Sequence, residues 1–193
     1  FIHELADAAG RDHLEFLLEI MGRPRWLDPG NTRTLNTGRA ADVIKLAAEK
    51  AGWGKRLPGG RGLGLAFYFS HAGHFAEVAE VSVDDNRKVT VHQVTVAADV
   101  GPIVNMSGAE NQCQGAVIDG LSTTLGLGLA IENGRVQESN FDQYPLLRIG
   151  SAPKVDVHFI QSEYAPTGLG EPALPPIAPA VCNAIFAASG YRV

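Results

Sequence analysis

The spacing of apolar residues changes near residue 55, and this change restricts the fold more than any other feature of the sequence. Upstream, apolar residues recur three and four positions apart, which predicts helices over 2–9, 12–21 and 38–51. Downstream, runs rich in valine, phenylalanine and threonine predict strands over 65–71, 75–83 and 88–98. Helices and strands come in separate runs rather than in regular alternation, and this order predicts an α+β fold with a mixed sheet and packed helices.

The same change divides the chain into two predicted parts. Residues 1–54 form a helical segment, and residues 55–193 form an α+β part that ends in a loop and a C-terminal helix. The connection over 55–64 is rich in glycine but lacks the GxxxxGK[ST] phosphate-binding pattern, which favours a flexible linker. The second part also contains a predicted helix over 108–125, a hairpin turn at Asn133-Gly134, a strand over 155–161 and a helix from Pro179 to Ser189.

Finer signals predict details of these elements. Residues 84–87 read as the turn of a hairpin, and the valines of the strand over 88–98 change phase halfway, which predicts a bulge near Gln93. Thr37 is a suitable N-cap for the helix that follows it. Arg39 is expected on the solvent-exposed side of that helix, together with Lys45 and Lys50.

Composition and charge exclude several classes of protein. With 45% hydrophobic residues the chain can form a packed core. The net charge is only −5 and no basic stripe is present, so a nucleic-acid partner is not expected. No apolar stretch has the length needed to cross a bilayer. Cys113 and Cys182 form no CxxC pair and are expected to be buried free thiols. The chain begins at Phe1, and we expect it to be a fragment of a larger protein.

The histidines and paired carboxylates give weak signals. His71 and His74 would point to opposite faces of a continuous strand and lack a third ligand nearby, so surface or turn positions are favoured over a metal site. Glu77 and Glu80 also fall on opposite faces of their predicted strand, which argues against shared acid–base work.

Two amides follow a strand that stops at glycine and proline. Gln112 and Gln114 lie in a predicted helix that is unusually rich in small residues. One of them could offer both a donor and an acceptor to a polar ligand that rests against the helix. Both could equally be solvated, and the residues alone leave the two interpretations open.

The segment from Thr167 to Pro176 is the most specific candidate for chemistry. Glu171 stands between glycines, which allow close approach of the backbone, and prolines, which fix the path of the chain. Its neighbours are apolar, and partial desolvation would raise the proton affinity of the carboxylate, as a general base requires. The alternative is a loop glutamate that caps the following helix.

The loop Gly168-Leu169-Gly170-Glu171-Pro172, followed by Pro175 to Ile185, resembles the loop that carries the catalytic glutamate in the xanthine dehydrogenase/aldehyde oxidase family of molybdenum hydroxylases. The resemblance covers almost the whole chain and is strongest to the C-terminal part of large (β) subunits of the isoquinoline 1-oxidoreductase-like branch. Residues 35–41, 47–54 and 139–145 also look like that branch. Two departures are Val100, where relatives often have cysteine, and Met106, where proline is more usual.

The resemblance implies a role for four residues. Glu171 matches the glutamate beside the molybdenum, and Gln112, in the pattern QxxGA, matches a glutamine that contacts the pterin cofactor. Gly115 and Gly170 match glycines at close backbone approaches to the cofactor. No residue is assigned as a metal ligand. The residues 55–193 would then form part of a molybdopterin-binding domain.

The implied reaction is oxidative hydroxylation of an N-heteroaromatic, isoquinoline-like substrate with oxygen derived from water, with Glu171 as the base. An aldehyde-oxidising enzyme of the same family is the first alternative. The second is a non-catalytic structural or assembly module, in which Glu171 would lie in a buried salt bridge or point to solvent away from any cleft.

The resemblance also implies a molybdenum–molybdopterin cofactor in its cytosine dinucleotide form, and a small partner subunit whose two [2Fe-2S] clusters remove the electrons. The glycine-rich cofactor segments that lie upstream in the family are absent from this sequence. We therefore expect the isolated chain to lack the cofactor, to be inactive, and to self-associate through an uncovered apolar face. A periplasmic location is suggested by the branch, with the cytoplasm as the alternative.

Overall fold

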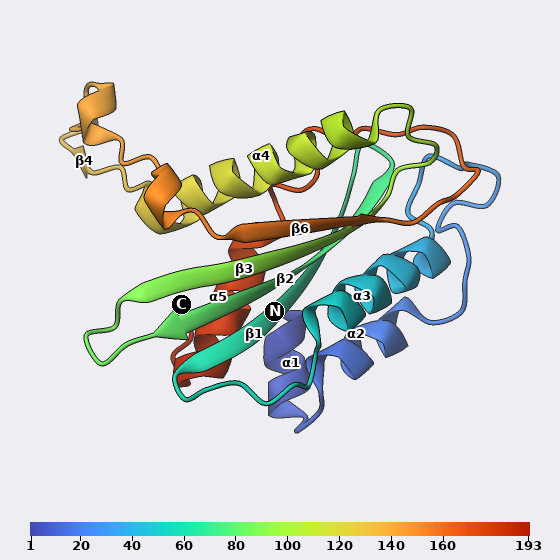
Figure 1. Ribbon diagram of the computed structural model, residues 1–193, viewed down its shortest axis with the longest axis horizontal. Coiled ribbons are helices and arrows are strands. Elements are labelled where there is room, and N and C mark those ends of the chain that lie inside the picture. The colour runs from blue at the N-terminus through green and yellow to red at the C-terminus, as the bar shows by residue number, and fades with distance from the viewer.

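A four-stranded sheet forms the centre of the computed structural model, which describes all residues from 1 to 193 (Figure 1). The strands follow the order β1-β2-β3-β6. β2 pairs antiparallel with both β1 and β3, and β6 pairs parallel with β3. Together with the helices on its faces, this mixed sheet confirms the predicted α+β fold. The strands are β1 Arg61–Ser70, β2 Gly73–Val83, β3 Val89–Asp99 and β6 Lys154–Phe159.

A bulge interrupts the pairing of β2 with β3. Glu80 lies opposite Gln93, whereas Val81 lies opposite Val91, so β3 carries one additional residue at this point. Because the additional residue reverses the alternation of side chains, Val91 and Val94 both face the same core. The predicted bulge near Gln93 is therefore confirmed.

Helices cover both faces of the sheet (Figure 1). One face carries α1 Ile2–Ala8, α2 His13–Met21 and α3 Thr37–Ala51, and its core includes Val43 and Ile44 of α3 with Leu65 and Val78 of the sheet. The other face carries α4 Met106–Gly126 and α5 Ile177–Ser189, and its core includes Val117 and Ile177 with Phe75 and Val96. No helix is both long and apolar enough to cross a membrane. The boundary at residue 54 stays a prediction.

The close packing of α5 on β1 depends on two glycines in the strand. A Cβ atom on Gly64 would collide with the backbone of Ala180 and Ala184, and one on Gly62 would meet the backbone of Ala184 and Ala188. The helix backbone therefore lies directly against the strand. This contact fixes the start of α5, and with it the end of the loop that carries Glu171.

Residues 127–151 follow α4 and form an arm, which projects at the upper left of Figure 1. The arm contains the predicted hairpin, with β4 Ile131–Glu132 and β5 Arg135–Val136 joined at Asn133-Gly134, where φ is 51° and 76°. Two short 3-10 turns, Phe141–Gln143 and Ile149–Ser151, follow before the chain returns to β6.

Three predictions about element ends were wrong. Asn36 caps α3 instead of Thr37, because its side chain accepts hydrogen bonds from the backbone of Gly38 and Arg39. The last helix begins at Ile177, two residues before Pro179. The strand β1 begins at Arg61, so the last residues of the predicted linker over 55–64 belong to the strand.

Two predictions about exposure were also wrong. Arg39 was expected on the solvent side of its helix but is only 4% exposed, and His74, expected at a surface or turn position, is fully buried in β2. Glu77 and Glu80 do lie on opposite faces of β2, as predicted: Glu80 pairs with Lys55 and Arg61, whereas Glu77 is fully buried.

Candidate functional site

Glu171 lies where the loop over 160–176 meets the tip of the β1–β2 hairpin. Two backbone hydrogen bonds tie the loop to the sheet: Gly168 N donates to His71 O at 3.1 Å, and Thr167 N donates to Val100 O at 3.1 Å. A third, from Leu174 N to Glu171 O at 2.9 Å, closes a turn around Glu171 itself. The loop is therefore held at the ends of β1 and β3.

A hollow of about 320 Å³ opens beside Glu171, between the loop and α4. It contains all four residues that the resemblance singles out, because Gln112 and Gly115 come from α4 and Gly170 and Glu171 from the loop. Their roles stay predictions, but the fold brings the four residues together. The remaining lining residues are Asn111, Ala116, Asp119 and Leu174.

The two glycines leave space in different ways. A Cβ atom on Gly170 would lie 2.8 Å from Oε1 of Gln112, so this glycine lets the loop approach α4. A Cβ atom on Gly115 would meet nothing within 4 Å, so this glycine keeps the wall of the hollow open. Of the two candidate amides, only Gln112 lines the hollow; Gln114 donates to Val155 O at 3.4 Å.

The carboxylate of Glu171 is exposed. Its side chain is 82% accessible to solvent, which contradicts the expected desolvation. The physical reason is that Pro172 and Ala173, its apolar neighbours, turn into the protein and leave Glu171 at the surface. The capping alternative is also wrong, because α5 begins six residues later with no side-chain cap. Glu171 is neither in a buried salt bridge nor away from a cleft.

One side chain lies close to the carboxylate of Glu171. Nε2 of His71 is 3.2 Å from Oε2 of Glu171, and the His71 side chain is 54% exposed. His71 occupies the hairpin turn, whereas His74 points into the core, where its Nε2 accepts a hydrogen bond from Asn36 N at 3.0 Å. Nowhere in the chain do three or more His, Cys, Asp or Glu side chains gather in a way that could hold a metal ion.

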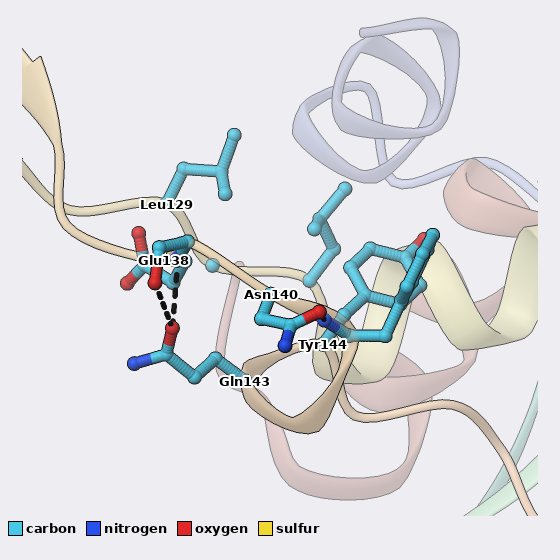
Figure 2. A pocket seen from close by; sticks show the side chains of 9 residues that line it. Leu129, Glu138, Asn140, Gln143 and Tyr144 are labelled. Carbon is cyan, nitrogen blue, oxygen red and sulfur yellow. Dashed lines mark hydrogen bonds between the residues drawn. The ribbon is translucent and has the colours of Figure 1, made fainter.

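A second hollow of about 320 Å³ lies in the arm, between Leu127 and Tyr144. Figure 2 shows two hydrogen bonds that end on the side chain of Gln143, whose Oε1 accepts from Ser139 N at 2.7 Å and Ser139 Oγ at 3.2 Å. Glu138 accepts from Ala130 N at 2.9 Å. These polar side chains are engaged in hydrogen bonds within the arm itself and serve to hold its shape. The hollow beside Glu171 is therefore the better candidate site.

A buried ion pair supports the loop from behind, and sequence reasoning missed it. The guanidinium of Arg39 donates to both carboxylate oxygens of Asp99, at 2.7 and 2.8 Å, and Ser162 Oγ donates to Oδ1 at 2.6 Å. Tyr164 stacks on Arg39, with its ring centre 4.3 Å from the guanidinium carbon. A usable signal existed: Arg39 lies four residues before Val43, on the buried stripe of its helix.

The ion pair determines the charge state of Asp99. Burial by itself would raise the pKa of Asp99, but the hydrogen bonds from Arg39 and Ser162 outweigh burial and lower that pKa below its usual value. Asp99 is therefore ionised. The two cysteines take no part in the site: both are free, Cys113 is buried and Cys182 half-buried, and burial raises the pKa of Cys113 to about 12.

Comparison with known families identifies the chain. The profile of the molybdopterin cofactor-binding domain matches residues 33–153. The chain therefore belongs to this family, and the resemblance to molybdenum-binding subunits of the xanthine dehydrogenase/aldehyde oxidase type is confirmed.

Three curated relatives align with nearly the whole chain. The first, named membrane-bound aldehyde dehydrogenase [pyrroloquinoline-quinone] from Gluconacetobacter polyoxogenes, is 35% identical over 100% of the chain and 26% of its own length. The beta chain of isoquinoline 1-oxidoreductase from Brevundimonas diminuta is 33% identical over 93% of the chain and 24% of its own length. A nicotinate dehydrogenase subunit from Pseudomonas putida is 32% identical over 100% and 17%. The chain thus spans about a quarter or less of these relatives.

Solved structures agree on the fold. Aldehyde oxidoreductase from Desulfovibrio gigas superposes with a TM-score of 0.72 over 100% of this chain and 38% of its own, at 14% identity. Quinoline 2-oxidoreductase from Pseudomonas putida 86 gives a TM-score of 0.57 over 61% and 16%, at 18% identity. At these identities the likeness concerns the fold alone.

Proposed function

We propose that this chain serves in the molybdenum-binding subunit of an oxidoreductase and supplies Glu171 as its general base. The observation that carries the proposal is the hollow between α4 and the loop, where Glu171, Gln112, Gly115 and Gly170 meet. These residues are up to 59 positions apart in the sequence, and each matches a position of the family motif.

The residues around the hollow suit a pterin cofactor. The amides of Asn111 and Gln112 offer donors and acceptors to a heterocycle, and Gly115 leaves room for it against α4. When bound, the molybdenum cofactor, in our proposal its cytosine dinucleotide form, supplies the redox chemistry. The glycine-rich cofactor segments of the family are absent from this sequence, so we expect the chain alone to purify without stoichiometric molybdenum.

Glu171 would work as the base from the rim of the hollow. Its carboxylate is exposed in this chain, so a substrate can reach it without a change in the fold. It would accept the proton released when a water-derived oxygen attacks the substrate, a role that contributes about 10²- to 10⁴-fold to rate in enzymes generally.

The proposed substrate is an N-heteroaromatic ring, and the electrons would leave through a small partner subunit with two [2Fe-2S] clusters. Support comes from two relatives whose names specify isoquinoline and nicotinate, at 33% and 32% identity. Oxidation of an aldehyde is the second candidate, because the relative at 35% identity is named an aldehyde dehydrogenase. That name also specifies pyrroloquinoline quinone, so the released cofactor should be analysed for both molybdopterin and quinone.

The test is the molybdenum content and turnover of the full-length subunit with its iron–sulfur partner, as wild type and as Glu171→Gln. We expect the variant to keep its molybdenum and to lose about 10²-fold or more of its turnover of azaarenes or aldehydes. Glu163→Gln is the matched control, since Glu163 is an exposed glutamate of the same loop that does not line the hollow. Full turnover by the Glu171 variant would refute the role of the base.

A further inference from the structure

We propose that His71 is a positioning residue that holds the carboxylate of Glu171 at the rim of the hollow, and that Ser70 orients its ring. The inference rests on the proposed role of Glu171 and adds a second element, the β1–β2 hairpin, to the site. Three independent features of the structure support it: the fit of the hairpin to the loop, the backbone of the turn, and the order of polar atoms along Ser70, His71 and Glu171.

The hairpin tip and the loop fit together at two glycines. A Cβ atom on Gly168 would collide with Cβ of His71, and one on Gly73 would lie 3.0 Å from Thr167 Oγ1 and 3.2 Å from Gly168 O. The hydrogen bond from Gly168 N to His71 O runs across the same junction. Backbone packing therefore holds residue 71 next to the loop that carries Glu171. The contact between the two residues does not depend on their side chains alone.

The backbone of the turn is unfavourable for the residues that form it. His71 and Ala72 have φ values of 51° and 65°, the left-handed region that hairpin turns usually fill with asparagine and glycine. A β-carbon at such positions adds a conformational cost, and sites that keep one commonly have a functional reason. At position 71 the turn places the imidazole beside Glu171, 3.2 Å from its carboxylate.

The order of polar atoms favours one arrangement of hydrogens in the neutral ring. Nε2 of His71 lies 3.2 Å from Glu171 Oε2, an ion-pair distance, and an ionised carboxylate can only accept, so we expect the ring to carry its hydrogen on Nε2. Nδ1 would then be an acceptor, and it lies 2.7 Å from Ser70 Oγ, which can donate to it. Ser70, His71 and Glu171 would form a directed chain that ends on the proposed base.

The contacts from Ser70 through His71 would restrict the carboxylate of Glu171, which is exposed and could otherwise rotate. Asp119, the other carboxylate of the hollow, comes from α4 on the opposite wall. With Nε2 of His71 beside Oε2 of Glu171, the other oxygen of Glu171 remains available to accept a proton. Removing the imidazole should therefore slow turnover without loss of cofactor.

The first test is spectroscopic and needs no cofactor. Long-range ¹H–¹⁵N spectra of the histidine rings of this chain report the tautomer, and the His71 signal is assigned by its absence in His71→Asn. We expect the Nε2–H form, with a ring signal that shifts in Glu171→Leu and in Ser70→Ala. An Nδ1–H form, or a His71 signal unchanged in both variants, would overturn the proposal.

The second test is kinetic and uses the full-length subunit with its iron–sulfur partner. His71→Asn suits the left-handed turn but is too short to reach Glu171, whereas His71→Gln can present an amide N–H near the position of Nε2. We expect His71→Asn to lose about 10- to 100-fold in kcat at wild-type molybdenum content, the range for groups that orient a reacting or ligating side chain. His71→Gln should recover part of that loss.

The control and the competing outcomes are distinct. His92→Asn removes another histidine that contacts a serine, Ser82 Oγ at 2.7 Å, far from the loop, and should turn over like wild type. Equal losses in His71→Asn and His71→Gln would mean that only the turn matters, which contradicts the proposal. Wild-type turnover in His71→Asn beside an inactive Glu171→Gln would refute this inference alone. Wild-type turnover in Glu171→Gln would refute the proposed function as well.

Discussion

The two faces of the sheet each bury one carboxyl group and treat it in opposite ways. On the face covered by α3, Asp99 receives hydrogen bonds from Arg39 and Ser162. On the face covered by α4 and α5, Glu77 is fully buried beside Cys113, and neither of its carboxyl oxygens has a partner. Burial raises the pKa of Glu77 well above its usual value of 4.5. One face therefore holds an ion pair, and the other holds an unpartnered carboxyl whose protonated form burial favours.

The largest expected effect comes from breaking the ion pair. Arg39→Met leaves the buried Asp99 carboxylate without its partner, and the loss of a partner inside a protein typically costs about 3–5 kcal/mol of unfolding free energy. Urea unfolding of the chain at pH 7 measures the change. The double variant Arg39→Met/Asp99→Leu removes both charges and should recover most of the loss. A loss below about 1 kcal/mol in the single variant would contradict a tight pair.

The opposite sign is expected on the other face. Glu77→Met keeps the approximate volume and removes the unpartnered oxygens, and should stabilise the fold by about 1–3 kcal/mol at pH 8. The pKa of Glu77 is raised in the folded state, so the stability that its protonated form gives the wild type is complete below pH 4.5. That stability is lost as pH rises toward the folded-state pKa. The gain should therefore shrink in acid. The matched control, Glu80→Met, removes a paired carboxylate and should give no gain; equal gains in both variants would refute the difference.

The smallest expected effect concerns acid sensitivity on the α3 face. Burial, and then the charge of Arg39, lower the pKa of His74 to about 4. Because the folded state favours the neutral ring, this stability is present above pH 6.5 and is lost as pH falls toward 4. His74→Gln should lose about 1–2 kcal/mol less than wild type between pH 7 and 5. Part of the acid sensitivity should remain, since burial also lowers the pKa of His13 to about 4. Identical pH profiles would contradict the role of His74.

Much of the fold could be predicted, because the spacing of apolar residues along the chain directly indicates a helix or a strand. The strands β1 to β3, the bulge opposite Glu80 and the hairpin at Asn133-Gly134 all follow from patterns within a few residues. The spacing of Arg39 and Val43 could have indicated that Arg39 is buried, but its partner Asp99 could not be read in this way, since it is 60 residues away. His74 was misjudged for a related reason: the strand stops at Ser70 and turns, so His71 and His74 are not two positions of one strand.

In the candidate site, too, local signals could be read from the sequence and contacts between distant residues could not. Glycine, glutamate and proline in one loop mark Glu171 as a candidate without any structure. Physical reasoning alone could not choose between Gln112 and Gln114; the resemblance chose Gln112, and the geometry places it in the hollow. The exposure of Glu171 was wrongly predicted, because the direction of a loop side chain depends on which neighbours turn inward. The contact with His71 was missed, since it joins positions 100 residues apart.

The parallel placement of β6 makes everything between β3 and β6 one long crossover, with α4 and the arm in its path. The hollow uses the middle of α4 and a loop beyond β6, while the arm lies in between and contributes nothing to it. Insertions or deletions in the arm should therefore leave the register of the sheet unchanged. For the same reason, the Asn133-Gly134 tip is a place where an epitope or a fluorescent label can be inserted while the candidate site is left intact.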